Sequence, residues 1–297
     1  MQSAPPSWGL DRIDDRTLPL DSTYDYGGYT GAGVRVYVLD TGVRTSHEEF
    51  GGRTDTGYTP ACPTGGEAAC GSNWFVNGVV DASCHPHGTH CAGTVAGVSA
   101  GVAKEATIVP VMVLGCDGSG STGYVIAGVE WAIADLAAHP GTRGVISMSL
   151  GGGGYSPAYD AAIRAAHDAG IPAVAAAGND GIDQCDASPL TEPKSIVVGA
   201  SDSSDARVYN FGACVDVFAP GARIYSAHSQ SDAAYAVYSG TSTAAPNPNP
   251  NPNPNPNPNP NLNPNPNPYL HVEVWLELRL PLAAGLRRAP TAGCVLT

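Results

Sequence analysis

Residues 34–42 read VRVYVLDTG, a run of β-branched and apolar residues that reaches Asp40 at its end. Such a run is typical of a strand that is buried on both faces, as strands in a parallel sheet are. Parallel sheets carry their functional groups in the loops that follow the carboxyl ends of the strands. Asp40 therefore stands where the chemistry of an α/β protein is expected.

Three further segments have the same strand-like character: residues 107–114, 144–150 and 172–177. Between them, residues 125–138 and 157–169 carry apolar side chains at helical spacing. A repeated alternation of strand and helix predicts an α/β fold in which helices cover both faces of a mostly parallel sheet.

The composition limits the classes of function. The chain has 297 residues, of which 42% are hydrophobic, and its formal net charge is −13. Nucleic-acid-binding surfaces need clustered lysine and arginine, so we expect no nucleic-acid partner. The sequence has no run of 18 apolar residues, so we expect no membrane partner. We also expect a monomer without an organic cofactor.

The cysteines indicate a cellular compartment. There are eight of them, and none forms a CxxC pair. Their spacing is more typical of disulfide bonds than of a metal site, and disulfide bonds form in oxidising compartments. Met1 leads directly into polar, proline-containing sequence rather than into a secretory leader. We expect a secreted, extracellular protein whose leader is not part of this sequence.

Three motifs carry the residue types of nucleophilic catalysis: VLDTG around Asp40, HGTHCAG from His87 and GTSTAAP around Ser242. A serine hydroxyl becomes nucleophilic when an imidazole takes its proton, and a carboxylate orients that imidazole and stabilises its cation. A fourth motif, AAAGND, contains Asn179, whose amide can donate to a developing oxyanion. Each motif alone is a weak indication, but together they predict a triad of Asp40, His87 and Ser242 with Asn179 as oxyanion donor.

The segment CHPHGTHC at residues 84–91 allows a zinc site as an alternative, because zinc accepts histidine and cysteine ligands. Its spacing fits no common zinc pattern, and the chain has no HExxH motif. We therefore expect His85 to be a loop residue and His90 to be a buried, hydrogen-bonded side chain.

These motifs resemble those of the subtilase family, and within it the proteinase K branch with its aqualysin-like extracellular proteases. The resemblance covers residues 7–246 and includes further stretches, namely WGLDRID at 8–14, HEEFGGR at 47–53, LGCDGSG at 114–120, SMSLGG at 147–152 and FAPG at 218–221. It implies a subtilisin-like three-layer fold and a serine endopeptidase that cleaves polypeptides through an acyl-enzyme. It also implies a folding pro-segment that is not part of this sequence.

The resemblance also implies the residues that hold the substrate. Two extended segments would sandwich the peptide as an added strand, formed by Gly118, Ser119 and Gly120 and by Ser149, Leu150 and Gly151. The second segment would wall the S1 pocket together with Ala176, Ala177 and Gly178. Small residues at these places imply broad specificity that leans to apolar or aromatic P1 side chains.

The cysteines match those of aqualysin-like enzymes, which implies the disulfide pairs Cys84–Cys116 and Cys185–Cys214. Cys62 and Cys70 flank a short glycine-containing loop, and we expect them to form a local third bridge. Cys91 stands where proteinase K-like members carry a free, buried thiol. Cys294 is then left over.

Calcium is the expected cofactor. Asp11, Asp14, Asp15 and Asp21 crowd the N-terminal segment, and hard cations prefer such oxygen ligands. Capping of helix starts is the alternative role for these side chains, and the resemblance favours calcium. It also implies a second site, formed by Asp216 with the carbonyls of Pro193 and Ser195.

The chain departs from the family after Pro246. We expect residues 1–246 to form a C-terminally incomplete peptidase domain and residues 247–268, a repeat of Asn-Pro, to be a disordered or polyproline-like linker. Residues 269–297 form an atypical tail, in which apolar and polar residues alternate over 270–280 and predict a strand.

In the family, the catalytic serine opens a long buried helix, and the prolines exclude that helix here. A reading-frame shift or assembly error within the repeat is one hypothesis, which an intact frame in a reliable DNA read would contradict. A natural fusion is the other. The alternative function is a truncated or frameshifted, non-catalytic protein that at most binds peptides.

Overall fold

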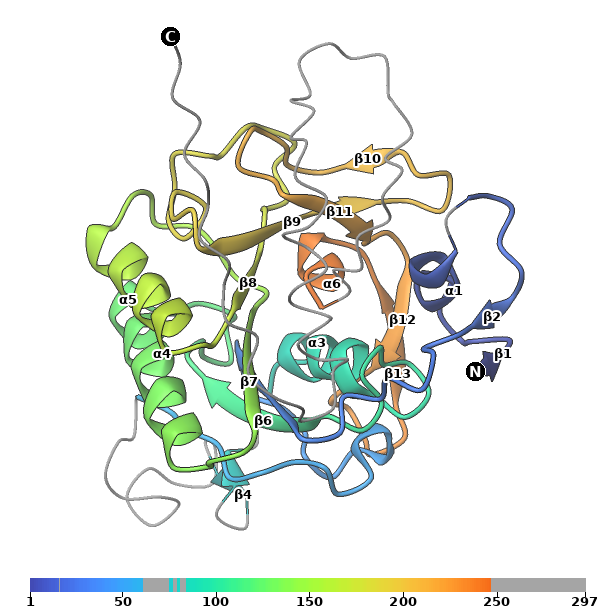
Figure 1. The fold of residues 1–297 in the computed structure, drawn as a ribbon, viewed down its shortest axis with the longest axis horizontal. Coiled ribbons are helices and arrows are strands. Elements are labelled where there is room, and N and C mark those ends of the chain that lie inside the picture. The colour runs from blue at the N-terminus through green and yellow to red at the C-terminus, as the bar shows by residue number, and fades with distance from the viewer. Residues whose placement is uncertain (16, 61–74, 77–78, 81–83, 247–297) are drawn as a thin grey trace, which may run out of the picture.

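The computed structural model describes residues 1–15, 17–60, 75–76, 79–80 and 84–246. Figure 1 shows a central sheet with helices on both of its faces. The predicted linker, the predicted strand at 270–280 and the atypical tail lie outside the described residues.

The central sheet is built around the strand that the VRVYVLD run predicts. Its strands lie in the order β6, β3, β7, β8, β9 and β10, and β11 also pairs with β9. All neighbours are parallel except β10, which is antiparallel to β9. Their bounds are Val34–Asp40 (β3), Thr107–Met112 (β6), Arg143–Met148 (β7), Ala173–Ala176 (β8), Ser195–Ser201 (β9), Arg207–Val208 (β10) and Val217–Pro220 (β11).

All four strands predicted from the sequence are confirmed. β6, β7 and β8 each end one or two residues earlier than the apolar runs that predicted them. The last residues of those runs leave the sheet and enter the loops at its carboxyl edge. All seven residues of β3 are buried, as expected for the middle of a parallel sheet.

Helices form the two outer layers. The helices α4 (Thr122–Ala137) and α5 (Pro157–Asp168), both predicted from their apolar spacing, cover one face of the sheet. Ser121 and Ser156 cap their first turns, because the hydroxyl of each accepts a hydrogen bond from the backbone N–H three residues later, that of Tyr124 and of Tyr159. The other face carries α1 (Trp8–Asp14), α3 (His87–Ala96) and α6 (Thr241–Ala244).

Successive residues of β3 point into opposite halves of the core. Val36 and Val38 join one apolar cluster, which includes Leu10 of α1 and Val95 of α3. The neighbouring Tyr37 and Leu39 join the other cluster. Its helix residues include Val125, Val129 and Ala132 of α4 and Ile163 and Ala166 of α5. Full burial of a large apolar side chain stabilises by about 1.5–3 kcal/mol. The three-layer α/β fold expected from the sequence is thus confirmed.

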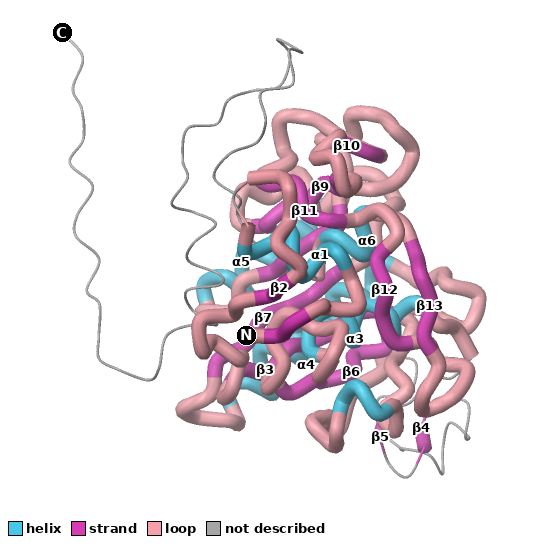
Figure 2. The backbone as a smooth tube through the Cα atoms, turned by 90° about the vertical axis from the view of Figure 1, so that its right-hand side faces the viewer, coloured by secondary structure: helices cyan, strands magenta, loops and turns pink. Residues whose placement is uncertain are grey.

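Short elements surround the sheet. Three two-stranded antiparallel sheets and a 3-10 helix are present among the described residues: β1 (Gln2–Ser3) with β2 (Thr23–Tyr24), β4 (Phe75–Val76) with β5 (Val79–Val80), β12 (Ile224–Ala227) with β13 (Tyr235–Tyr238), and η1 (Glu48–Phe50). Figure 2 shows β12 and β13 side by side along one flank. Among the described residues, no helix has both the length and the apolar character needed to cross a bilayer.

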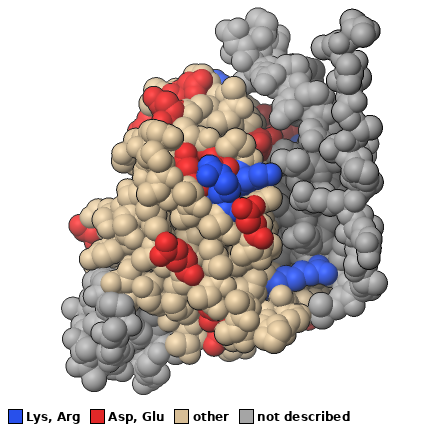
Figure 3. Space-filling view, turned by 60° about the vertical axis from the view of Figure 1, so that its left-hand side comes forward, with Lys and Arg blue, Asp and Glu red and all other residues tan. Residues whose placement is uncertain are grey.

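The surface reflects the low proportion of charged residues, which is 14% of the chain. Figure 3 shows the side of the molecule that carries α4 and α5 in Figure 1. Most of the described surface in this view is uncharged, and the acidic and basic side chains are scattered over it. Charge on this face is therefore not gathered into one extended patch.

One ionic cluster ties α4 to the sheet. Arg35 of β3 has a side chain that is only 7% exposed, and it donates to Asp135 of α4 at 2.8 Å and to Asp55 at 2.6 Å. The same Asp135 oxygen accepts a hydrogen bond of 2.8 Å from the Tyr37 hydroxyl. A buried guanidinium needs such acceptors, because an unpaired buried charge is costly.

Replacement Asp135→Ala is expected to lower the free energy of unfolding by about 3 kcal/mol, because it removes one of the two carboxylates that neutralise the buried Arg35 guanidinium. Urea denaturation measures this difference. The exposed Glu130 on the same helix provides the control, and Glu130→Ala should change stability by less than about 0.5 kcal/mol. Equal stability of the two variants would contradict the role given to the cluster.

Candidate active site

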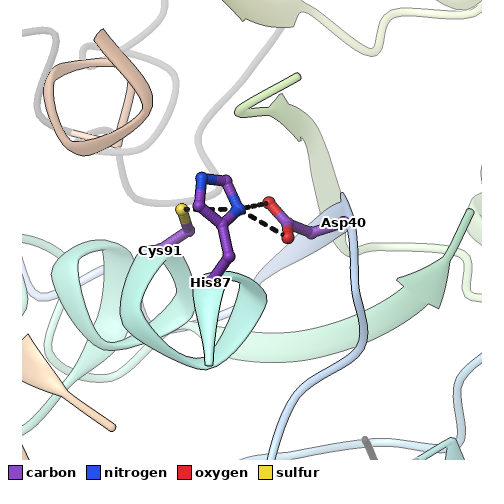
Figure 4. A group of neighbouring side chains, drawn as sticks. All are labelled: Asp40, His87 and Cys91. Carbon is purple, nitrogen blue, oxygen red and sulfur yellow. Dashed lines mark hydrogen bonds and ion pairs between the residues drawn. The ribbon is translucent and has the colours of Figure 1, made fainter. Parts of the chain in front are cut away.

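Asp40 and His87 form a hydrogen-bonded pair at the carboxyl edge of the sheet. The Nδ1 atom of His87 lies 2.8 Å from Oδ1 and 2.9 Å from Oδ2 of Asp40 (Figure 4). The Asp40 side chain is fully buried, whereas that of His87 is 28% exposed. The carboxylate therefore orients the imidazole from inside, and the ring keeps its other nitrogen, Nε2, on the opposite edge.

Local structure fixes both partners. Asp40 is the last residue of β3, and its Oδ1 also accepts a 2.7 Å hydrogen bond from the backbone of Thr41. The Thr41 hydroxyl accepts a 3.0 Å hydrogen bond from the backbone of Gly88. A Cβ atom at Gly88 would collide with the Gly42 carbonyl oxygen and lie 3.1 Å from Asp40 Oδ1. The small residues of the two motifs thus let β3 and the start of α3 meet.

Cys91 follows His87 by one turn of α3 and is buried and free. Its Sγ lies 4.0 Å from His87 Nδ1 and donates to the carbonyl of Ser242 at 3.5 Å. Figure 4 shows the imidazole between this sulfur and the Asp40 carboxylate. The thiol thereby links the histidine to the serine motif, and the expected free, buried cysteine is present.

The surroundings raise the pKa of His87 above the ordinary value of histidine. Electrostatic interactions with Cys91 and then with Asp40 raise it, burial opposes them, and the hydrogen bond to Asp40 adds to the increase. Because the pKa is raised in the folded state, the pair stabilises the fold most where His87 is protonated. This stabilisation is lost as the pH rises through the folded-state pKa.

Ser242 lies in the first turn of α6 and is bonded to the end of β7. Its Oγ donates to the carbonyl of Ser149 at 3.1 Å, and the Ser149 hydroxyl donates to the carbonyl of Ser242 at 2.8 Å. This reciprocal pair brings the first turn of α6 against the loop after β7. Together with the Cys91 contact, it places Ser242 in the same region as the Asp40–His87 pair.

Asn179 is held beside the serine motif by Thr241. Its Oδ1 accepts hydrogen bonds from the backbone N–H of Thr241 at 2.8 Å and from the Thr241 hydroxyl at 3.0 Å. Because a backbone N–H only donates, the amide oxygen must face Thr241, and the amide nitrogen is left as the outward donor. The Thr241 hydroxyl also accepts a 3.0 Å hydrogen bond from Gly178, so it links both segments.

The expected substrate segments lie at the carboxyl ends of three strands, after β6, β7 and β8. Gly118 and Ser119 lie in a tight turn closed by a 2.8 Å hydrogen bond from the Gly115 backbone to the Ser119 carbonyl, and Gly120 follows it. They enter α4 rather than forming a strand.

Ser149 is buried in the second segment, Leu150 is half-buried, and Gly151 is exposed. The third segment is largely buried: Ala176 ends β8, and Ala177 and Gly178 follow it. The roles of these residues in holding substrate stay predictions.

Both disulfide bonds implied for the described residues are confirmed, Cys84–Cys116 and Cys185–Cys214. The first joins the segment that precedes His87 to the turn before Gly118. Cys62 and Cys70 lie outside the described residues, as does Cys294. The sulfur of Cys84 is therefore used in the disulfide bond to Cys116 and is not free to bind a metal. His90 Nε2 lies 3.2 Å from the Ile224 carbonyl. Both observations argue against zinc in the 84–91 segment.

Three of the four aspartates expected to hold calcium converge. Ligand oxygens of Asp11, Asp15 and Asp21 lie within 4.8 Å of one another. Asp14 is not in this group: one of its oxygens accepts a 2.6 Å hydrogen bond from the Asp25 backbone, and the other is buried without a hydrogen-bond partner among the described residues. Asp11 is 6% exposed, and its Oδ1 is buried without a hydrogen-bond partner among the described residues.

The second expected calcium site centres on Asp216. Its Oδ2 accepts a 2.8 Å hydrogen bond from the Val197 backbone, and its own N–H donates to the Val197 carbonyl at 2.9 Å. Ser195 is buried nearby on β9, and Pro193 is exposed. The carboxylate is thus held beside β9, and a metal-binding role for these residues stays a prediction.

Sequence reasoning missed three residues that hold the site together: Thr41, Thr241 and Asn210. Thr41 and Thr241 stand next to Asp40 and Ser242 inside the quoted motifs, so their position was a usable signal. Asn210 is fully buried and hydrogen-bonded to the segment around Asn179. The sequence contains no signal for it, because its partners lie about 30 residues away in the chain.

A parallel α/β sheet that presents a carboxylate–imidazole pair beside a serine motif has the arrangement of a serine hydrolase. The model of the subtilase family, peptidase S8, matches residues 31–247, and the chain belongs to this family. This confirms the resemblance found in the sequence motifs.

The chain is 48% identical over 245 residues to the extracellular serine proteinase of Thermus sp. (strain Rt41A), which covers 82% of this chain and 55% of that protein. It is 47% identical to the alkaline serine exoprotease A of Vibrio alginolyticus, over 80% of this chain and 41% of that protein. A crystal structure of a cold adapted subtilisin-like serine proteinase matches with a TM-score of 0.68, 45% identity and 81% coverage of both chains. The chain spans about half the length of these two curated relatives.

Replacement Asp40→Asn is expected to lower the pKa of His87, because the carboxylate that stabilises the imidazolium is lost. Titration of the ring carbons by NMR measures the change. His167 on α5 serves as the internal control, and its ring signals should respond to pH identically in the two proteins because it lies on a different helix. An unchanged His87 titration would show that the hydrogen bond does not set the charge of this ring.

Proposed function

We propose that this chain is a serine endopeptidase that cleaves polypeptides through an acyl-enzyme. The observation that carries the proposal is the hydrogen bond between His87 Nδ1 and the buried Asp40 carboxylate, beside the motif that contains Ser242. Its relatives are named as proteinases, and 48% identity to one of them favours peptidase activity over a non-catalytic protein that only binds peptides.

In the proposed reaction, the Ser242 hydroxyl exchanges its bond to Ser149 for one to Nε2 of neutral His87. The imidazole takes the proton while Oγ attacks the scissile carbonyl, and Asp40 stabilises the imidazolium that forms. His87 then gives this proton to the leaving amine, and an acyl-enzyme remains. A water molecule, whose proton goes to His87, then attacks the acyl-enzyme, and the carboxylic acid product is released from Ser242. Activity should rise with pH through the pKa of His87, because only the neutral ring accepts a proton.

Asn179 is the proposed oxyanion donor. Its oxygen is engaged by Thr241, which directs the amide nitrogen away from Thr241 and toward the exposed side. A donor that is already oriented costs no rearrangement when negative charge develops on the carbonyl oxygen. Thr241 and Ser242 are consecutive, so the same turn of chain positions the nucleophile and the donor.

Substrate specificity follows from the segments at the strand ends. We propose that peptide backbone pairs with Gly118–Gly120 on one side and Ser149–Gly151 on the other, as an added strand. The S1 pocket is assigned to the second segment with 176–178. Small side chains there are consistent with broad specificity that leans to apolar or aromatic P1 residues.

Extracellular action is proposed from the names of the relatives. One is called an extracellular serine proteinase and another an exoprotease, and a relative from Orbilia oligospora is called a cuticle-degrading serine protease. Two disulfide bonds among the described residues fit an oxidising compartment. A pro-segment and a monomeric state are part of the same proposal.

We also propose a structural calcium ion at Asp11, Asp15 and Asp21. Burial raises the pKa of Asp11, and the charges of Asp15 and Asp21 raise it further. A divalent cation relieves this repulsion, and the buried Oδ1 of Asp11 supplies an oxygen of the kind that calcium prefers. The donor set therefore fits calcium. Asp216 with Pro193 and Ser195 is proposed as a second site on family resemblance.

Replacement Ser242→Ala is expected to abolish labelling by a fluorophosphonate and to lower kcat for casein or a chromogenic peptide by about 10⁴-fold or more, since the nucleophile is removed. The exposed Ser203 provides the control, and Ser203→Ala should react like the parent chain. Labelling that persists in the Ser242→Ala protein would contradict the proposed nucleophile.

Calcium is expected to raise the melting temperature of the full chain, because it binds the folded form. At one hundred times its dissociation constant, it would add about 2.7 kcal/mol. Differential scanning calorimetry with calcium and with EDTA measures this effect, and Asp11→Asn should reduce it strongly. Asp168→Asn, at the exposed end of α5, is the control. A calcium response that is equal in both variants would place the ion elsewhere.

A further inference from the structure

The proposed oxyanion donor stands on an exposed stretch of chain. Asn179 itself is exposed, and its amide oxygen is anchored by two hydrogen bonds from Thr241. Its amide nitrogen can serve the reaction only if the backbone on both sides of it keeps one position. An error of about 1 Å in such a group is enough to weaken catalysis strongly.

Asn210, which follows β10 and is 0% exposed, bonds to that backbone on both sides of Asn179. Its side chain donates to the carbonyl of Ala177 at 2.9 Å. Its Oδ1 accepts hydrogen bonds from the backbone N–H groups of Asp180 at 2.8 Å and Ile182 at 3.2 Å. Its own backbone N–H donates to the carbonyl of Gly178 at 3.2 Å.

The amide group of Asn210 is used completely. Its second N–H donates to Gln184 Oε1 at 2.9 Å, so two donors and the acceptor oxygen all have partners within the 177–184 segment. An asparagine amide carries the same N–H donor and C=O acceptor as a peptide group. Residues 177–182 have left the sheet, and the Asn210 amide gives their backbone the hydrogen bonds that a neighbouring strand would otherwise supply. Buried polar groups that are satisfied in this way hold a single geometry.

Gly178 shows how closely the two segments fit. A Cβ atom at this position would collide with the Nδ2 atom of Asn210 and lie 2.8 Å from Gln184 Oε1. Gly178 also has a φ of +97°, a backbone conformation that residues with a side chain rarely adopt. The absence of a side chain at 178 is therefore what allows Asn210 to approach the chain directly before Asn179.

The same two segments are joined again farther along. The Phe211 backbone donates to the carbonyl of Ile182 at 3.1 Å, and the Cys185–Cys214 disulfide closes the pair of segments. The disulfide thus joins the two segments at the end farther from Asn179, and Asn210 joins them at the end next to Asn179.

We propose that Asn210 is a positioning residue for peptide-bond cleavage, which fixes the 177–182 backbone so that the Asn179 amide meets the oxyanion. The inference rests on the proposed function of Asn179. Asn210 does not act on the substrate itself. Its contacts go to residues that flank Asn179 and to the proposed S1 wall, and this distinguishes it from an asparagine that only fills the core.

Replacement Asn210→Ala is expected to lower kcat by about tenfold to a hundredfold, with a smaller change in KM. The loss approaches but does not exceed the roughly 10²–10³-fold effect of removing an oxyanion donor. The interaction with the oxyanion exists only in the transition state, so kcat bears most of the change. The concentration of active sites is measured by fluorophosphonate titration, and kcat is calculated per active site, so that unfolded protein does not lower its value.

A double-mutant cycle with Asn179→Ala gives a readout that a merely structural role would not produce. If Asn210 acts through Asn179, the second replacement should add less than about threefold once Asn179 is gone. A peptide aldehyde, which forms an oxyanion on the serine, should lose affinity for Asn210→Ala as kcat falls. The corresponding product peptide, which forms no oxyanion, should lose much less affinity than the aldehyde. If the fold-loss of kcat in the double variant equals the product of the losses in the two single variants, the inference is overturned.

Two comparisons keep the test decisive. Tyr24→Phe, which removes a buried 3.0 Å hydrogen bond to the Val102 carbonyl, should lower stability without lowering kcat. Asn210→Ser leaves a hydroxyl that can still accept or donate, and its kcat should lie between those of the parent and of Asn210→Ala. If Asn210→Ala does not fold, Asn210→Ser carries the same cycle, and a kcat equal to that of the parent contradicts the proposal.

The two levels of the proposal fail in different ways. If Asn179→Ala keeps full kcat, the oxyanion assignment in the proposed function is wrong, whatever Asn210 does. If Asn179→Ala loses kcat and both Asn210 variants keep it, the function stands and the inference about Asn210 is wrong.

Discussion

The hydrogen bond between the Asp40 carboxylate and the His87 imidazole is the interaction around which the rest of this structure is arranged. A fully buried carboxylate is tolerated only when donors surround it. Asp40 obtains them from the Thr41 backbone and from His87. To deliver that imidazole, α3 must begin at His87 and lie against the end of β3, and Gly88 is the residue that permits this approach. One buried charge thus fixes where a strand ends and where a helix begins.

The remaining site residues are held by one another at the same edge of the sheet. The loop after β7 bonds Ser242 through Ser149, and the loop after β8 bonds Thr241 through Asn179. Each link joins segments that are about 60 or more residues apart in sequence, so none of them is stable as a local structure. The parallel sheet supplies the convergence, because the carboxyl ends of β3, β7 and β8 lie side by side.

The sequence predicted what local patterns and motifs encode. Apolar runs located β3, β6, β7 and β8, helical spacing located α4 and α5, and family resemblance supplied the Cys84–Cys116 and Cys185–Cys214 pairs. The hydrogen bonds made by Thr41, Thr241 and Asn210 were not predictable, because a threonine or asparagine has no pattern that names a distant partner. The separation of Asp14 from the other three aspartates was not predictable either, because sequence spacing does not fix which of four neighbouring carboxylates converge.

The first turn of α6 bears on the departure of the sequence after Pro246. In the family, the catalytic serine opens a long buried helix, and the prolines after Pro246 exclude that helix here. Here the described turn is anchored from residues that precede it, since the Thr243 hydroxyl donates to the Gly221 carbonyl and Ala244 is buried in the core with Val174 and Ala200. These contacts lie wholly within residues 1–246. The position of the serine is therefore defined by the sheet and its loops, and the stabilising effect of a longer helix is a separate contribution.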